Sequence, residues 1–403
     1  MTESLLPAGF DRQLFLRDYW QKKPLLIRAG ELDFVDPITP EELAGLACEQ
    51  DVESRLVQVN AAQDAWQLRT GPFSEAEFEA LPQTHYSLLV QAVDQWVDEV
   101  SALLADFDFI PSWRIDDVMV SYATDSGNVG PHFDYYDVFL IQGMGQKRWQ
   151  IGAMCNSMTP RRDDSGLRLL KDFKAEQEWT VNPGDILYLP PGISHYGVAI
   201  GNSMTYSVGF RAPSHADMIG GLADQVLDEL TQDHRYIDVH PQLPLHSGEI
   251  SADVVQHVRE RVLSLLDRPE KIRQWFGKAM TTPRYVSDEH APCCDHHDDV
   301  DHDHDDPDIS DIITLRNALE GGAEVFKVPG SRYAYALDET HAELFVDGEC
   351  YPCNWRLLPL LQALSAPGHT EALDPDVVAA CNADEEAAQL LLTLYNRGCL
   401  IIG

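Results

Sequence analysis

The spacing of hydrophobic residues changes near residue 112. Before that point, the pattern predicts a region that is mostly helical, with some strand. Pro40, followed by Glu41 and Glu42, predicts the start of a helix, because proline suits the first turn and acids suit the positive end of the helix dipole. Apolar residues at helical spacing across residues 86–104 predict a second, buried helix.

From residue 112 to residue 211 the apolar residues alternate with a period of two, which is typical of strands. Turn-forming Gly, Pro and Asn residues separate the segments. Many short strands punctuated in this way predict a barrel or sandwich. The seven expected strands are VMVSY, DVFLIQ, KRWQI, EWTV, DILYLP, YGVAI and MTYSVGF.

The pattern changes again after residue 211. Two or three amphipathic helices are expected in residues 214–279, one of them capped by the serine that opens SADVVQHVRERVLSLLD. Residues 288–308 hold ten acids, five histidines, two cysteines and no Lys or Arg, a composition that predicts a disordered linker with only adventitious metal binding. The remainder predicts a small module of helices and strands.

The composition narrows the range of partners. A formal net charge of -37 disfavours direct binding of nucleic acid and favours a basic protein partner, although the charge could serve solubility alone. No segment is long and apolar enough to predict a membrane span, and the N-terminal residues do not predict a signal peptide. Eight scattered cysteines do not form a disulfide framework, which predicts a reducing, cytoplasmic location.

Two motifs predict a metal site. In GPHFDYYD, His132 and Asp134 are two residues apart on an expected strand, so an imidazole and a carboxylate lie side by side. By itself this pair also fits a surface His and Asp at a barrel rim. Residues 184–195, GDILYLPPGISH, match the second cupin motif, in which a Pro-Gly turn returns His195 to the barrel mouth. Two histidines and one carboxylate leave three positions open on an octahedral ion, as non-haem Fe(II) oxygenases require.

A lysine and a serine suggest the cosubstrate. By alternation Lys147 shares an apolar, inward face with Trp149 and Ile151, where it needs an anion unless it reaches out to solvent at the barrel edge. The distal carboxylate of 2-oxoglutarate is such an anion, and the hydroxyl of Ser207 is a plausible second partner.

Together these segments resemble the JmjC-type ribosomal oxygenases, most closely the bacterial arginine 3-hydroxylases of ribosomal large-subunit protein sixteen. The resemblance spans QKKPLLIRAG, WRIDDVMVSY, PHFDYYDVFLIQGMGQKRW, PGDILYLPPGISHYG and YSVGFRAP. It implies Fe(II) bound by His132, Asp134 and His195, with 2-oxoglutarate at Lys147 and dioxygen as the oxidant. It also implies an arginine pocket formed by Asp117, Met119 and Tyr136, although Asp117 alone could be a strand-end acid and Met119 a core residue.

The fold implied is α+β: a JmjC double-stranded β-helix with N-terminal helices, a helical dimerisation region and a C-terminal winged-helix-like domain. The expected boundaries are 1–212 for the catalytic domain, 213–284 for the helical region, 285–308 for the acidic linker and 309–403 for the C-terminal domain. The C-terminal module carries five basic and fourteen acidic residues, so it is not expected to bind DNA in the ordinary way.

The sequence therefore predicts an enzyme, a homodimeric 2-oxoglutarate-dependent hydroxylase acting on an arginine of a basic ribosomal protein. Histidine hydroxylation and N-methyl-lysine demethylation on the same site remain open. A further alternative is a cupin that binds metal without oxygenase activity.

Overall fold

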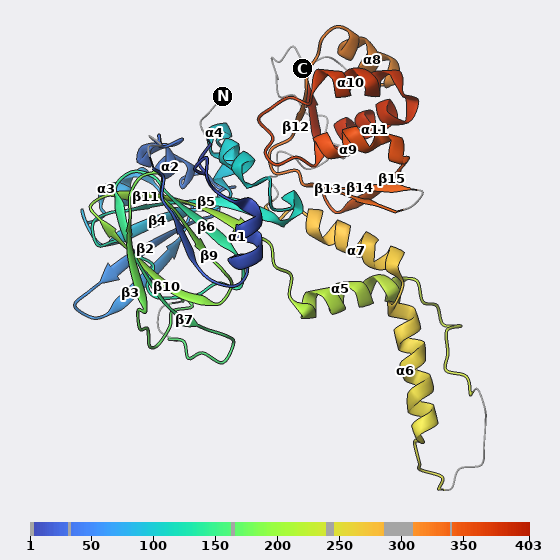
Figure 1. Cartoon of the computed structure of the whole chain (residues 1–403), viewed down its shortest axis with the longest axis horizontal. Helices are drawn as coiled ribbons and strands as arrows, with labels where there is room; N and C mark the ends of the chain where they lie inside the picture. Colours follow the sequence, from blue (N-terminus) through green and yellow to red (C-terminus); the bar gives the residue numbers. More distant parts are fainter. Residues whose placement is uncertain (1–3, 31–33, 163–165, 239–245, 286–308, 339–340) are drawn as a thin grey trace.

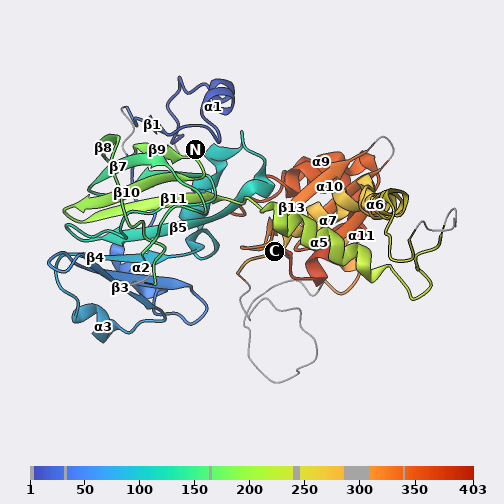
Figure 2. The ribbon, with the colours of Figure 1, turned by 90° about the horizontal axis from the view of Figure 1, so that it is seen from below.

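The computed structural model describes residues 4–30, 34–162, 166–238, 246–285, 309–338 and 341–403. A β-barrel built from the first half of the chain stands beside a compact C-terminal domain, and a helical arm projects from the junction between them (Figure 1). Figure 2 shows that the arm and the C-terminal domain lie together on one side of the barrel. The acidic segment 288–308 lies outside the described residues.

Two antiparallel sheets form the barrel. The larger has the order β1-β9-β6-β11-β5-β4-β2-β3, and the smaller has the order β10-β7-β8. The strands are β1 (Leu25–Ile27), β2 (Ser54–Asn60), β3 (Ala65–Thr70), β4 (Tyr86–Val90), β5 (Ile115–Ala123), β6 (Val138–Gln142), β7 (Gln146–Met154), β8 (Gln177–Val181), β9 (Ile186–Leu189), β10 (Ile193–Ile200) and β11 (Ser203–Phe210).

Strands β6 and β9 of the large sheet each contribute to two different cores. Phe139 on β6 and Tyr188 on β9 are fully buried in the larger apolar cluster, which also contains Phe15 from helix α1 (Arg12–Asp18). The intervening residues Leu140 and Leu187 belong to a smaller cluster with residues of β7 and β10. Strand alternation therefore puts one set of side chains inside the barrel and the other set behind it. All seven strands predicted between residues 112 and 211 are confirmed.

The helix predicted over residues 86–104 is wrong. Residues 86–90 form β4, which pairs with β2 and β5, and Ala92 then has a positive φ of 52° that ends the strand. Only short helices follow: η1 (Val93–Gln95), α4 (Asp98–Ser101) and η2 (Ala102–Phe107). A short run of buried apolar residues fits both periods, and here pairing with β2 and β5 decides for a strand. Four strands also contradict a mostly helical first hundred residues.

Three further short helices lie in the first 114 residues: α2 (Pro40–Leu46), α3 (Glu75–Glu79) and η3 (Ser112–Arg114). The helix expected at Pro40 is confirmed as α2. Thr39 and Glu42 form a reciprocal capping box at its N-terminus.

The helical arm contains α5 (His215–Asp228), α6 (Ala252–Leu266) and α7 (Pro269–Thr281), as the amphipathic pattern predicted. Ser251 caps α6 by accepting a hydrogen bond from Val254 N, and Pro269 opens α7. Helix α6 buries none of its residues against the rest of the described chain. No helix among the described residues could span a membrane.

The C-terminal domain packs its helices on a small antiparallel sheet around its own apolar core. The sequence predicted α8, α9, α11, β13 and β14 but missed α10 and three short strands. The elements are α8 (Ile312–Glu320), β12 (Val325–Lys327), β13 (Tyr333–Leu337), β14 (Ala342–Val346), β15 (Glu349–Cys353), η5 (Trp355–Leu357), α9 (Leu358–Leu364), α10 (Pro375–Ala383), α11 (Glu385–Asn396) and β16 (Leu400–Ile402).

One partly buried arginine links the C-terminal domain to the barrel. The Arg332 guanidinium donates to the backbone carbonyls of Trp113, Ile115 and Asp116, at the start of β5, and to that of Met280 in α7. Arg332 therefore holds three parts of the chain together at the strand that leads into Asp117.

Candidate metal centre and active site

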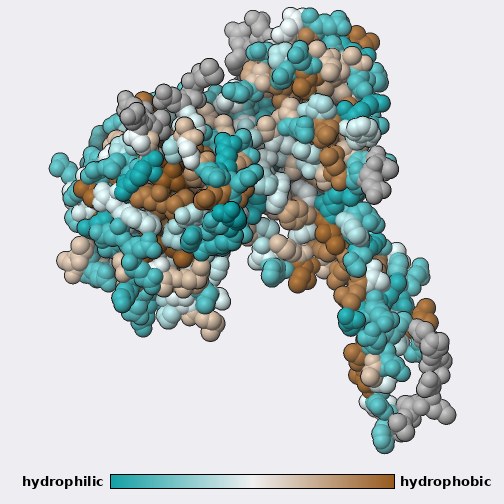
Figure 3. All heavy atoms as spheres, viewed as in Figure 1, coloured by the Kyte–Doolittle hydropathy of each residue, from teal (hydrophilic) through white to brown (hydrophobic). Residues whose placement is uncertain are grey.

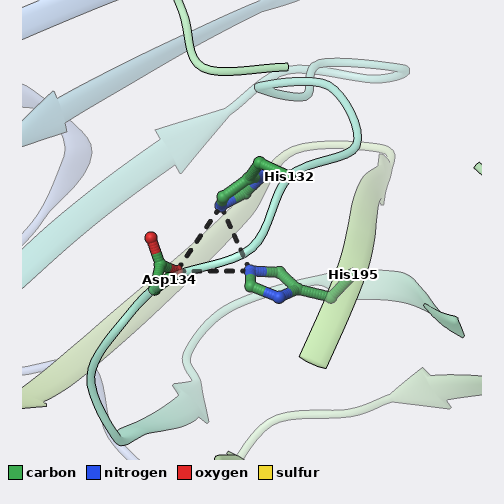
Figure 4. Close-up of side chains that lie close together, drawn as sticks. All are labelled: His132, Asp134 and His195. Carbon is green, nitrogen blue, oxygen red and sulfur yellow. Dashed lines mark hydrogen bonds and ion pairs between the residues drawn. The ribbon is translucent and has the colours of Figure 1, made fainter. Parts of the chain in front are cut away.

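Three ionisable side chains meet at the mouth of the barrel. His132 and Asp134 lie on the segment between β5 and β6, and His195 lies on β10 (Figure 4). His132 N donates to His195 O over 3.0 Å, and His195 N donates to His132 O over 2.8 Å. Because this reciprocal pair fixes the two backbones side by side, it brings together residues that are 63 positions apart in the sequence.

The Pro-Gly turn before His195 fixes the position of β10. Gly192 has a φ of 83° and its N–H donates to Asp134 O over 2.7 Å. A Cβ on Gly192 would lie 2.7 Å from the Met154 sulfur and 3.0 Å from a backbone oxygen, so this position requires glycine for both conformation and space. The turn therefore attaches His195 to the segment that carries Asp134.

Hydrogen bonds to the backbone orient both imidazoles. His132 Nδ1 lies 2.9 Å from Gly130 O, and His195 Nδ1 lies 3.0 Å from Ile193 O. Since a carbonyl can only accept, each Nδ1 carries the proton and each Nε2 presents a lone pair. The two Nε2 atoms are 3.1 Å apart, and Asp134 Oδ2 lies 3.8 Å from His132 Nε2 and 3.6 Å from His195 Nε2.

This donor set fits a metal cation. Burial lowers the pKa of His195 to about 4, so near neutral pH it does not supply the proton that an Nε2–Nε2 hydrogen bond would need. Two lone pairs and a carboxylate that converge in this way repel one another unless a cation lies between them. Ligands about 2.1 Å from an ion at right angles stand about 3 Å apart, close to the spacing here. Among the described residues no other group of three metal-ligating side chains converges like this.

Lys147 points into the barrel, as its alternation predicted. Its side chain is buried, its Nζ lies 3.3 Å from Thr205 Oγ1, and the ammonium lies 5.1 Å from the centre of the Trp149 ring. Burial lowers the pKa of Lys147 to about 8, and no ion pair to it is found among the described residues. A buried ammonium with one hydroxyl contact still favours an anion.

Thr205 is the hydroxyl partner that sequence reasoning missed. The alternation of β11 puts Thr205 and Ser207 on the same inward face, and both are buried. The structure brings Thr205, not Ser207, into contact with Lys147. Listing every hydroxyl on that face of the strand could have found it.

Asp117 and Met119 share the inward face of β5, and Met119 pairs with Ser207 of β11. Asp117 is buried, and its Oδ2 accepts a hydrogen bond from Ala92 N over 3.0 Å. Burial, with the nearby charges of Asp94 and Asp116, raises the pKa of Asp117 to about 7. The residue that sequence reasoning missed here is Asp94, which accepts from Val118 N over 2.7 Å and crowds Asp117 with negative charge.

Tyr136 follows the metal-site residue Asp134 by two positions. Its side chain is half-exposed, and partial burial, together with the charges of Asp134 and Asp117, raises the pKa of its phenol. Arg284, on the segment after α7, pairs with Asp116 at 2.9 Å.

A barrel of two facing sheets with an inward set of two imidazoles and one carboxylate defines a cupin-fold metalloprotein whose ligand set is the one that non-haem iron oxygenases use. Two family models match the chain: the JmjC domain over residues 102–218, which contains every candidate site residue, and the ROXA-like winged helix over residues 264–400. They confirm the predicted JmjC barrel and the winged-helix character of the C-terminal domain.

Several relatives support a closer assignment. The chain is 43% identical to the Escherichia coli ribosomal protein uL16 3-hydroxylase over 68% of this chain and 72% of the relative. It is 37% identical to a probable ribosomal oxygenase of Haemophilus influenzae over 70% and 73% of the two chains. The crystal structure of Escherichia coli YcfD, described as a ribosomal oxygenase in complex with cobalt and 2-oxoglutarate, superposes with a TM-score of 0.81 at 33% identity, covering 98% of each chain.

The chain belongs to the JmjC-domain ribosomal oxygenase family of 2-oxoglutarate-dependent dioxygenases. This membership decides against the alternative of a cupin that binds metal without oxygenase activity.

Because the three ligands converge on one point, the variant Asp134→Ala should lose affinity for the metal. Because even the loss of an outer partner of a metal ligand costs about 10–100-fold in affinity, removing the carboxylate should weaken Co²⁺ binding at least about 100-fold. Titration followed by the visible absorption of Co²⁺ measures this directly. The exposed His215→Ala is the matched control and should bind like the wild type. Equal cobalt affinity in Asp134→Ala would contradict the site.

Proposed function

We propose that this protein is an Fe(II)- and 2-oxoglutarate-dependent hydroxylase that adds a hydroxyl group to the β-carbon of an arginine in the ribosomal protein uL16. The observation that carries the proposal is the buried Asp117 carboxylate on the inward face of β5, in a barrel whose mouth holds a two-histidine, one-carboxylate metal site. The activity of the Escherichia coli relative supports the same assignment.

His132, Asp134 and His195 are the residues that hold the iron, and they leave positions free for the cosubstrate and dioxygen. When bound, the iron supplies the oxidising chemistry, with 2-oxoglutarate as the source of two electrons. The protein orients the reacting groups. The carbonyls of Gly130 and Ile193 fix the tautomers of the two imidazoles, so that both lone pairs stay directed at one point.

Lys147 is the group that receives the distal carboxylate of 2-oxoglutarate, and Thr205 and Ser207 line the same face with hydroxyls. The ammonium is buried, so the pairing is not screened by water. Trp149 lies beside both Lys147 and His195, with its ring 5.8 Å from the imidazole, and closes the apolar wall between the cosubstrate lysine and the metal ligands.

Asp117 is the partner of the substrate guanidinium. One of its oxygens accepts from Ala92 N, which leaves the other free for a charge-assisted hydrogen bond. The Met119 thioether and the Tyr136 ring supply apolar surfaces for the arginine stem and the guanidinium plane. Histidine hydroxylation is less well supported, because a carboxylate in this position selects for a cation.

The substrate protein is basic, and the formal charge of -37 attracts and steers such a partner. The same charge opposes direct contact with nucleic acid, even for the winged-helix domain, since a winged helix needs positive charge to neutralise phosphates. A modifier of ribosomal protein acts in the cytoplasm, where that protein is made.

The helical arm is the dimerisation region, and a second copy of the chain covers α6. Val254, Val258 and Val262 form an exposed stripe at four-residue spacing, with Val255 and Leu263 beside it. Figure 3 shows apolar surface along the arm. Because α6 buries none of its residues against the part of the chain that the structure describes, its apolar face would gain burial in an assembly.

Replacing Lys147 by methionine tests the cosubstrate site. The loss of a buried charge partner should raise the Kd for 2-oxoglutarate by about 100-fold or more, while cobalt binding stays within about threefold of wild type. Titration of the cobalt-loaded protein with 2-oxoglutarate measures both. Lys174→Met, at an exposed lysine, serves as the control. The cosubstrate role fails if Lys147→Met keeps wild-type affinity for 2-oxoglutarate.

The raised pKa of Asp117 predicts how substrate use depends on pH. Below pH 7 the carboxyl is mostly protonated and cannot pair with guanidinium, so the KM for a uL16 peptide should be about tenfold higher at pH 6 than at pH 8. In Asp117→Asn this pH dependence should disappear and kcat/KM should fall about 100-fold.

Mass spectrometry of the peptide after incubation with Fe(II), 2-oxoglutarate and air reads out the product. A gain of one oxygen on arginine supports the proposed function, whereas loss of a methyl group or a gain on histidine would identify one of the alternatives. The exposed Asp233→Asn is the control and should keep the wild-type profile. A wild-type pH profile in Asp117→Asn would remove Asp117 from the substrate pocket.

Light scattering tests the assembly. The wild type should have twice the 45.2 kDa mass of the chain. Val258→Glu should shift the protein to the monomer mass, because a charge in an apolar interface is costly to bury. Arg259→Glu, at the neighbouring exposed position of the same helix, should remain a dimer. A wild type of monomer mass would refute the dimer.

A further inference from the structure

A groove of about 480 Å³ lies between the barrel and α7. Tyr135 and Tyr136 form part of one wall, and Trp275 and Ala279 of α7 form part of the other. None of these groove residues is needed to hold the metal or the cosubstrate. Aromatic and aliphatic residues dominate the lining, which also includes Phe210, Ala212, Pro213, Met280 and Pro283.

The charged residues at the groove already have partners. Asp116 pairs with Arg211 at 2.8 Å and with Arg284 at 2.9 Å. Arg211 also donates to Thr282 O over 2.8 Å. Asp217, the remaining charged residue of the lining, accepts hydrogen bonds from Ser214. The two acids and two arginines of the lining sum to zero formal charge, and the rest of the groove presents mainly an apolar surface.

The groove is closely packed on its helical side. The Trp275 ring packs directly over Gly221 of α5, where an added Cβ would lie 2.3 Å from Trp275 Nε1. Met280 is buried at the floor, with Phe210 from the end of β11. A preformed pocket of this kind binds an apolar side chain without first having to reorganise.

The groove lies beside the proposed arginine pocket. Tyr136 lines the groove and is two residues from the metal ligand Asp134. Asp116, at the groove, precedes Asp117 near the start of β5, and Phe210, also at the groove, ends β11 directly after Gly209, whose Cβ position lies 3.5 Å from Asp117 Oδ1. A peptide that places its arginine on Asp117 therefore has the groove within reach of its neighbouring residues.

We propose that this groove is an apolar subsite that binds a large aliphatic or thioether side chain located one or two positions from the target arginine in the substrate protein. The inference rests on the proposed function and adds a second specificity element to it. The helical arm thus contributes to substrate selection through α7, besides carrying the α6 stripe. A second copy of the chain is the weaker candidate, because the unburied apolar stripe is on α6 and the groove shares Tyr136 with the proposed substrate pocket.

The test uses Ala279→Leu in the full-length, iron-loaded protein. Ala279 is exposed on α7 and lines the groove, and leucine is a good helix former, so the variant should fill the groove without disturbing the helix. Ala380→Leu, at an exposed position of α10 in the C-terminal domain, is the matched control.

The substrates are uL16-type peptides that contain one arginine. The two positions on each side of the arginine are varied one at a time, and the varied position is leucine, methionine or glycine. Wild type and Ala380→Leu should hydroxylate the best apolar peptide with a kcat/KM about tenfold above that of its glycine counterpart, the size expected for one apolar side chain in a pocket. In Ala279→Leu this ratio should fall to within about twofold of one, while the rate on the glycine peptide stays unchanged.

The possible outcomes separate the two proposals. If the wild type hydroxylates none of the peptides, the proposed function fails and the subsite fails with it. If it hydroxylates them without an apolar preference, or if Ala279→Leu keeps the wild-type preference, only the subsite is overturned. A change from dimer to monomer mass in Ala279→Leu would instead assign the groove to contacts between two copies and would also overturn the subsite.

Discussion

The two backbone hydrogen bonds between His132 and His195 are the constraint on which the active site depends. They join the segment after β5 to the start of β10, and the Gly192 N–H adds a third bond from the turn to Asp134 O. Without them the three metal ligands would lie on separate parts of the barrel. Because all three bonds are made by the backbone, the ligand side chains are held by the fold and not by one another, and they can stay close together despite the repulsion between their lone pairs.

Around that fixed point the barrel mouth holds three buried or partly buried groups, each of which lacks one partner. The metal ligands converge on a position for a cation, Lys147 needs an anion, and the free oxygen of Asp117 needs a cationic donor. In the proposed reaction, iron, 2-oxoglutarate and a substrate arginine are the partners that these groups would take. Each of these groups costs free energy while it is unpaired, so the site favours the complete complex over any single ligand. Arg332, in the C-terminal domain, donates hydrogen bonds to the backbone of the strand that carries Asp117.

The sequence predicted the parts of this arrangement that are local. Alternation along single strands gave the seven barrel strands and the inward direction of Lys147, and the Pro-Gly turn predicted where His195 returns. Contacts between distant segments were not predictable in this way. Residues 86–104 have helical spacing, but β2 and β5 pair with their first part, and Thr205 was missed because the hydroxyl that meets Lys147 depends on how β11 faces β7. The groove beside α7 needs three segments to come together, and no motif marks it.

The most direct test of the central claim is to follow labelled dioxygen. The iron-loaded protein is mixed anaerobically with 2-oxoglutarate and a uL16 peptide, then exposed to ¹⁸O₂, and the products are sequenced by mass spectrometry. The products should carry one ¹⁸O atom on the β-carbon of a single arginine and one ¹⁸O atom in the succinate, in a ratio close to one. Succinate formed without a labelled arginine, or label on another residue, would contradict the claim that this site holds an arginine beside the metal.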